Sequence, residues 1–161
     1  MPVPAVIAAA AENFRFNSQF LENSVKDLAP EDWLRRPAAN MNHITWIVGH
    51  MTWTRGRLLH YIGVEWAQPS LDLFARGAKL AEDSAYPSPE SLLGAWREST
   101  SAVTAALENV SDDALAQPSA HPRSADGKIS GIVNFLALHE TYHGGQISYL
   151  RCWLGHKGLM G

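Results

Sequence analysis

Two histidines near the end of the chain have the spacing that points most directly to chemistry. His139 and His143 are four positions apart in a segment with helical periodicity, so both imidazoles should project from one face of a helix. Two imidazoles confined together in a low-dielectric core need either separate hydrogen-bonding partners or a shared metal ion. This pair therefore favours a metal site. The mainly apolar stripe on the same face predicts that it points into a core: Ile132, Phe135, Leu136, Gln146, Leu150 and Trp153.

Residues 139–143 also spell H-E-x-x-H, the pattern of zinc peptidases in which the glutamate acts as general base. Such peptidases take their third ligand from further along the chain. No Asp or Glu follows Glu140, and Gln146 and Tyr149 stand where the extended pattern requires glycine and histidine. The sequence therefore disfavours a peptidase, and we expect Glu140 at the surface or beside the ligands.

The third ligand is accordingly expected upstream of the pair. His50 is the best candidate because it lies midway along another helical segment among apolar neighbours, although a lone histidine in such a place is more often a hydrogen-bonded core residue. His43 falls in the first helical turn, where a capping or solvated role is expected. His60 lies near the helix end, and His121 is expected to be solvated in a proline-rich loop.

Four segments carry helical periodicity, and none shows the alternation of a strand. They span residues 4–26, 43–62, 88–109 and 129–154. Asn42 is expected to cap the second segment, and Ser88 with Pro89 opens the third. Residues 64–87 form a long connection with a short helix expected at 71–75. The pattern predicts an all-α four-helix bundle with a long connection between helices 2 and 3, in one domain over residues 1–161.

Composition narrows the class of protein. The 161 residues are 46% hydrophobic and 18% charged, with a net charge of −3 and no basic block, so nucleic-acid binding is not expected. Cys152 is the only cysteine, which excludes an intrachain disulfide, and we expect a core thiol there. No apolar run approaches the ~20 residues of a membrane span, and the start lacks a positively charged leader. A soluble, cytoplasmic protein is the expectation.

Two stretches of the chain resemble the motifs of the DinB-like (DinB/YfiT-like) family. Residues 42–50 read Asn-His-Ile-Thr-Trp-Ile-Val-Gly-His, and residues 138–147 read Leu-His-Glu-Thr-Tyr-His-Gly-Gly-Gln-Ile. The helix order and residues 28–37, which are similar to a Leu-x-x-Glu-x-Trp-x-x-x-Pro linker, extend the resemblance over nearly the whole length. It implies an up-down-down-up bundle, frequently a homodimer, with one divalent metal ion, zinc or nickel, held by three residues: His50, His139 and His143.

The resemblance also implies a reaction class. Characterised members include enzymes that use the small thiols mycothiol or bacillithiol, so a thiol-dependent S-transferase or isomerase acting on a small molecule is expected. Some members carry a glutamate where this chain has His139, which makes this site more cationic by one unit. A non-catalytic metal-binding bundle, serving as sensor, store or interaction module, stays open. A metal-dependent hydrolase or peptidase is the remote alternative.

No residue stands out as an acid–base partner for a metal site. The candidates lie near the expected ligands: Gln146, Tyr142, Arg57 and Glu140. Gln146, three positions after His143, is expected at the pocket. Arg57, seven positions after His50, could meet an anionic substrate or the carboxylate of a thiol, although a solvated charge near a helix end is the ordinary interpretation. The two tryptophans that flank His50 are expected either to line the cavity or to pack in the apolar core.

Overall fold

Four long helices make up most of the computed structural model, which describes residues 3–66, 71–121 and 123–159. No strand occurs in these described ranges, so the all-α bundle is confirmed. The long helices are α1 (Ala8–Val25), α2 (Ile44–Tyr61), α3 (Pro89–Asn109) and α5 (Ile129–Trp153). The short elements are η1 (Ala5–Ile7), η2 (Pro30–Leu34), η3 (Leu71–Phe74), η4 (Asp83–Ala85) and α4 (Asp112–Ala116).

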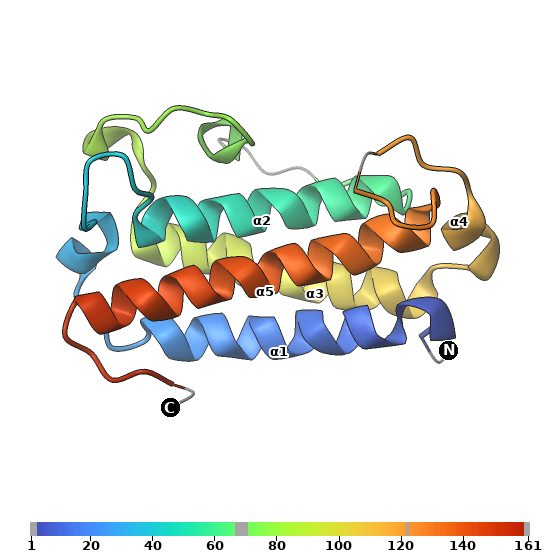
Figure 1. Cartoon of the computed structure of the whole chain (residues 1–161), viewed down its shortest axis with the longest axis horizontal. Helices are drawn as coiled ribbons and strands as arrows, with labels where there is room; N and C mark the ends of the chain where they lie inside the picture. The colour runs from blue at the N-terminus through green and yellow to red at the C-terminus, as the bar shows by residue number, and fades with distance from the viewer. Residues whose placement is uncertain (1–2, 67–70, 122, 160–161) are drawn as a thin grey trace.

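The helix order gives the bundle its topology. In Figure 1, α1 and α5 run in one direction and α2 and α3 in the other, which is the expected up-down-down-up order. Helix α1 packs beside α3 and α5, and α2 also packs beside α3 and α5. The neighbours α2 and α3 are therefore parallel. Because parallel neighbours cannot be joined by a short turn, the chain must return along the bundle between them, which explains the long connection.

Helix boundaries follow local capping chemistry and correct several expectations. Ser88 caps α3 as predicted, accepting a hydrogen bond from the backbone N–H of Ser91. Helix α2 is capped by His43 rather than Asn42, because the Nδ1 atom of His43 accepts from the N–H of Trp46 at 3.1 Å. Burial lowers the pKa of His43 to about 4, which keeps the ring neutral and able to accept. The first long helix begins at Ala8, after a 3₁₀ turn, instead of at residue 4.

The apolar core is formed by two clusters that follow each other along the bundle. One includes Met51 and Trp96, and the other includes Leu58 and Ile132. All four long helices contribute side chains to both clusters. No helix in the described residues combines the length and the apolar character needed to cross a membrane.

The connection between α2 and α3 is anchored on α2 by Phe74. This residue ends η3, which occupies 71–74 where the sequence predicted a short helix at 71–75. Its ring is fully buried and lies against Gly49, where an added Cβ would come within 2.4 Å of the ring. The carbonyl oxygen of Phe74 accepts a hydrogen bond from Nδ1 of His50 at 2.7 Å. The glycine thus permits a close approach that orients His50.

We predict that Gly49→Ala displaces Phe74 and destabilises the fold by about 1–3 kcal/mol, because the methyl group overpacks this contact. The free energy of unfolding in urea measures the effect. Gly94→Ala in α3 is the control, since nothing lies within 4 Å of the added Cβ there. That change should be neutral or stabilising by up to about 1 kcal/mol. Equal effects of the two substitutions would contradict the close approach.

Candidate metal centre

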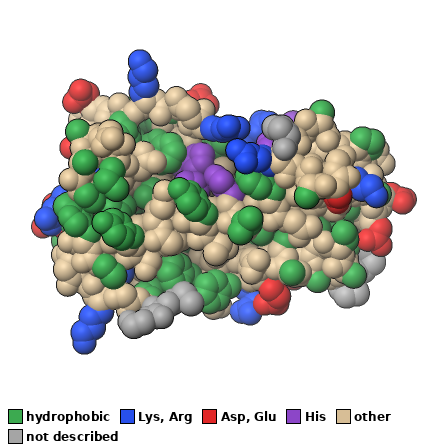
Figure 2. Space-filling view, viewed as in Figure 1, with side chains coloured by type: hydrophobic (Ala, Val, Ile, Leu, Met, Phe, Trp, Pro, Cys, Tyr) green, Lys and Arg blue, Asp and Glu red, His purple; other side chains and the backbone are tan. Residues whose placement is uncertain are grey.

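Three histidines from two helices converge at one point of the bundle. His50 comes from α2, and His139 and His143 come from successive turns of α5. One ring nitrogen from each lies within 4.8 Å of the other two, and the Nε2 atoms of His139 and His143 are 3.1 Å apart. In Figure 2, histidine side chains lie in a hollow of the surface with Lys or Arg side chains beside them. The structure therefore brings together the three residues singled out from the sequence.

The second ring nitrogen of two of these histidines is fixed by a protein acceptor. Nδ1–H of His50 donates to the carbonyl of Phe74, and Nδ1–H of His143 donates to Oε1 of Gln146 at 2.7 Å. Since Nδ1 carries the proton in both rings, Nε2 keeps its lone pair and is the atom free to bind an ion. Trp46 stacks on the His50 ring with 4.7 Å between centroids, which further restrains it.

The pair of His139 and His143 fits a divalent cation in spacing, and all three rings fit it in charge state. Two nitrogens each about 2.1 Å from a tetrahedral ion lie about 3.4 Å apart, close to the observed Nε2 separation. Burial lowers the pKa of His139 and of His143 to about 4, and it lowers that of His50 as well. Arg76, and the other two rings when they are protonated, lower the pKa of His139 further by charge repulsion. The rings are therefore neutral near pH 7, which is the metal-binding form.

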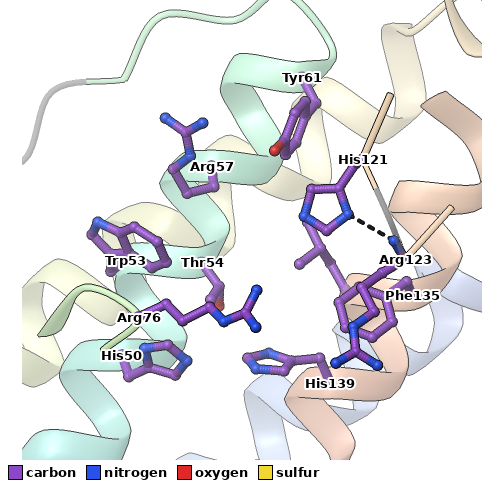
Figure 3. Close-up of a pocket in the computed structure, with 11 residues that line it drawn as sticks. His50, Trp53, Thr54, Arg57, Tyr61, Arg76, His121, Arg123, Phe135 and His139 are labelled. Carbon is purple, nitrogen blue, oxygen red and sulfur yellow. Dashed lines mark hydrogen bonds between the residues drawn. The ribbon is translucent and has the colours of Figure 1, made fainter. Parts of the chain in front are cut away.

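A cavity of about 250 Å³ opens beside the cluster, with His50 and His139 in its wall (Figure 3). Arg57, for which a solvated charge near a helix end was the ordinary interpretation, lines this cavity. His121, which we expected to be solvated, is half-buried and forms part of the wall. The other residues that line it are Trp53, Thr54, Tyr61, Arg76, Arg123, Phe135 and Leu136.

Gln146 and Tyr142 lie outside this cavity, in a separate surface hollow next to α5. Gln146 nevertheless adjoins the cluster, because its side-chain oxygen holds His143 and its amide nitrogen donates to the hydroxyl of Tyr142 at 3.1 Å. Tyr142 itself is 63% exposed. Of the four pocket candidates, Arg57 thus faces the cavity and Gln146 orients one histidine.

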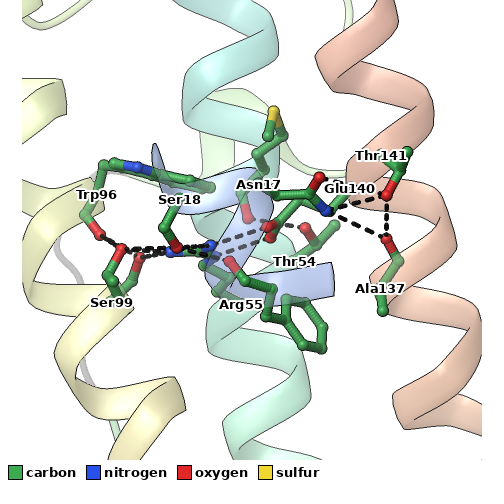
Figure 4. A network of polar contacts seen from close by, with 12 residues as sticks. Asn17, Ser18, Thr54, Arg55, Trp96, Ser99, Ala137, Glu140 and Thr141 are labelled. Atoms are coloured by element: carbon green, nitrogen blue, oxygen red, sulfur yellow. Dashed lines mark hydrogen bonds and ion pairs between the residues drawn. The ribbon is translucent and has the colours of Figure 1, made fainter. Parts of the chain in front are cut away.

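Glu140 belongs to a buried polar layer instead of to the pocket (Figure 4). Nε and Nη2 of Arg55 donate to its two carboxylate oxygens, each at 2.8 Å, and both side chains are 1% exposed. Along α2, Arg55 lies between Met51 of one apolar cluster and Leu58 of the other, and Glu140 separates the same clusters along α5. The guanidinium also contacts groups of α1 and α3: Ser18, Ser99, Thr100 and the ring of Trp96.

The burial of Glu140 corrects the expectation of a residue at the surface or beside the ligands. Successive residues of a helix are about 100° apart, so Glu140 points into the bundle while His139 faces the cavity. Burial raises the pKa of Glu140, and the guanidinium of Arg55 opposes that shift. Both carboxylate oxygens are engaged by Arg55, and this arrangement gives no support to the peptidase role of the H-E-x-x-H string.

Two expectations for the end of α5 are also corrected. Cys152, expected in the core, is exposed, and Trp153 of the proposed inward stripe is 41% exposed. The side chains of Leu150 and Arg151 occupy the inward face there, and the next two positions rotate away from it. Neither residue contributes to the histidine cluster.

Sequence reasoning missed three arginines that the structure makes prominent. Arg55 could have been found, because it lies four residues after Met51 and three before Leu58 on the apolar stripe of α2. Arg76 and Arg123 lie in connections without periodicity, so no pattern in the sequence placed them beside the cavity.

We predict that Glu140→Gln lowers the free energy of unfolding by about 3–5 kcal/mol, because it leaves the buried charge of Arg55 unpaired. The double variant Arg55→Met with Glu140→Met should recover most of that loss, since no buried charge remains. Glu22→Gln, which removes an exposed ion pair with Arg97, is the control and should cost less than about 1 kcal/mol. Similar losses in the two single variants would argue against a structural role for the buried pair.

Comparison with known proteins places this chain and its fold in a family. The model of the DinB superfamily matches residues 14–147. No curated protein gave a significant match. The solved structure of YfiT from Bacillus subtilis, described as "a probable metal-dependent hydrolase with an unusual four-helix bundle topology", is similar with a TM-score of 0.66. The match covers 92% of this chain and 87% of that one at 12% identity, a level that supports the fold alone. This chain belongs to the DinB superfamily.

Proposed function

We propose that this protein is a metal-dependent enzyme acting on a small molecule, with one divalent ion held by His50, His139 and His143. The observation that carries the proposal is the convergence of three ring nitrogens within 4.8 Å beside a cavity. An ion with three protein ligands keeps open coordination positions and supplies a Lewis acid that lowers the pKa of a thiol or of water.

The residues around the cluster would prepare it for this task. His50 is held by the Phe74 carbonyl and by stacking on Trp46, and His143 is held by Gln146. Because these partners fix the rings before any ion binds, little ordering is left for metal binding. His50 and His139 also line the cavity, so a small molecule bound there would lie next to the ligands.

For the reaction, we favour transfer or isomerisation that depends on a low-molecular-weight thiol, with zinc or nickel as the ion. The resemblance to thiol-using DinB-like enzymes supports this choice. The cavity adds a physical reason, because no Asp or Glu occurs among its described lining residues to act as a carboxylate base. A thiol with a pKa near 8.5 needs less help to ionise than water at about 15.7.

Hydrolysis is the second candidate, and the similarity to YfiT, which is described as a probable metal-dependent hydrolase, favours it. A non-catalytic metal store or sensor is the third. A store requires the three ligands but has no use for the cavity beside them. The three possibilities differ in what they consume. A thiol-dependent transferase consumes a thiol and an electrophile, a hydrolase consumes water and an ester or amide, and a store or sensor consumes nothing.

We predict that protein purified without chelators contains one divalent ion per chain, measured by elemental analysis. His50→Ala and His143→Ala should each lose it, since two imidazoles bind far more weakly than three. Gln146→Leu should weaken metal binding about 10- to 100-fold through the loss of the hydrogen bond to His143. His121→Ala, which changes the cavity wall outside the cluster, is the matched control. Full occupancy in both ligand variants would refute the assignment.

We predict that metal-loaded protein accelerates the reaction of mycothiol, bacillithiol or cysteine with an activated aryl chloride, and that His50→Ala abolishes the acceleration. Product analysis by mass spectrometry measures the adduct. Ester or amide cleavage without a thiol would instead favour the hydrolase. Absence of turnover in both assays, with the metal fully bound, would favour the non-catalytic alternative.

A further inference from the structure

Three arginines line the cavity beside the histidine cluster and come from separate parts of the chain. Arg57 is on α2, Arg76 follows η3, and Arg123 lies in the loop that precedes α5. In Figure 3, Arg76 lies near His139, Arg123 lies beside Phe135, and Arg57 lies at the other end of the space, near Tyr61. Three segments distant in sequence each supply one guanidinium. The positive charge of this cavity therefore arises only when the folded chain brings these segments together.

These three arginines have no carboxylate partner in the described part of the chain. No Asp or Glu is among the described residues that line the cavity. Five other arginines form ion pairs with Asp or Glu: Arg15, Arg35, Arg55, Arg97 and Arg151. In a chain with net charge −3, carboxylates are abundant, yet this cavity is left cationic. Grouped like charges repel each other, and an anion that enters the cavity would relieve that repulsion.

Aromatic walls hold two of the guanidinium groups without using their hydrogen-bond donors. The guanidinium of Arg57 lies over the ring of Tyr61 at 5.6 Å, and that of Arg123 over the ring of Phe135 at 5.8 Å. Such cation–π contacts restrain the side chain and leave its N–H groups free. Arg76 is near enough to His139 for its charge to act on that ring. The donors of the three arginines thus face one cavity, and those of Arg76 lie nearest to the cluster.

We propose that the cavity binds a small molecule carrying an oxyanion group, a carboxylate or a phosphate, which Arg57, Arg76 and Arg123 recognise. Planar guanidinium groups match the two oxygens of such groups in bidentate geometry. The volume of about 250 Å³ is below the range of drug-sized sites, which favours a small acid over a peptide. Anion binding by the arginines does not depend on the proposed function. The further step, in which the reacting end of the molecule meets the histidine cluster, rests on the proposed function.

The experiment uses the full chain, first stripped of metal with a chelator and then dialysed free of it. Calorimetric titration measures binding of succinate, of glycerol phosphate and of neutral succinamide. Succinate or glycerol phosphate should bind, with an affinity that falls as salt rises, and succinamide should not. Comparison of the two anions distinguishes a carboxylate site from a phosphate site. Each of Arg57→Gln, Arg76→Gln and Arg123→Gln should weaken binding about tenfold.

Arg15→Gln is the matched control, because it removes the same charge from an exposed arginine outside the cavity and should leave affinity unchanged. Unfolding midpoints of all variants exclude loss of the fold as a cause. Equal binding of succinate and succinamide, no loss in the three cavity variants, or no binding of either anion would overturn the proposal. Because the titrations use metal-free protein, a failure to bind anions is distinguishable from a failure of the metal site. Anion binding should also persist in His143→Ala, which lacks one of the proposed metal ligands.

Discussion

The buried ion pair between Arg55 and Glu140 is the interaction on which the rest of the arrangement depends. Arg55 lies five residues after His50 on α2, and Glu140 directly follows His139 on α5. Because the guanidinium meets both carboxylate oxygens, the pair fixes how far α2 and α5 can slide past each other. A shift of one turn would break the pair and would also separate His50 from the other two histidines. The polar layer therefore sets the register that the candidate metal centre requires.

Burial and charge then act together at the site. Neutral imidazoles are favoured by desolvation, and the positive charge of Arg76 also opposes protonation of His139. A divalent ion held by three neutral ligands keeps its full charge, and the arginines add to the positive field. Such a site suits anionic partners, whether an ionised thiol or an acidic substrate. The DinB-like proteins with a glutamate at the position of His139 would have a less positive centre.

Much of this fold and part of the site could be predicted from residue patterns. Helical periodicity located all four long helices, and the spacing of His139 and His143 placed both rings on one face. Properties that depend on contacts between distant segments were not predictable in this way. Nothing in the periodicity of α5 indicated that Glu140 would be paired with Arg55, and the chain path that brings Arg76 and Arg123 to the cavity has no local signal. Cys152 and Trp153 were wrongly expected in the core, because the last turn of α5 directs Leu150 and Arg151 inward and rotates the next two positions away.

Anomalous diffraction from crystals of metal-loaded protein tests directly whether three ring nitrogens hold one divalent ion. Data collected on both sides of the absorption edge of the metal locate the ion and identify it. For zinc, we expect one anomalous peak per chain, about 2.0–2.1 Å from Nε2 of His50, His139 and His143. An ion bound elsewhere, or bound through Nδ1 of His50 or His143 with the bonds to Phe74 and Gln146 broken, would contradict it.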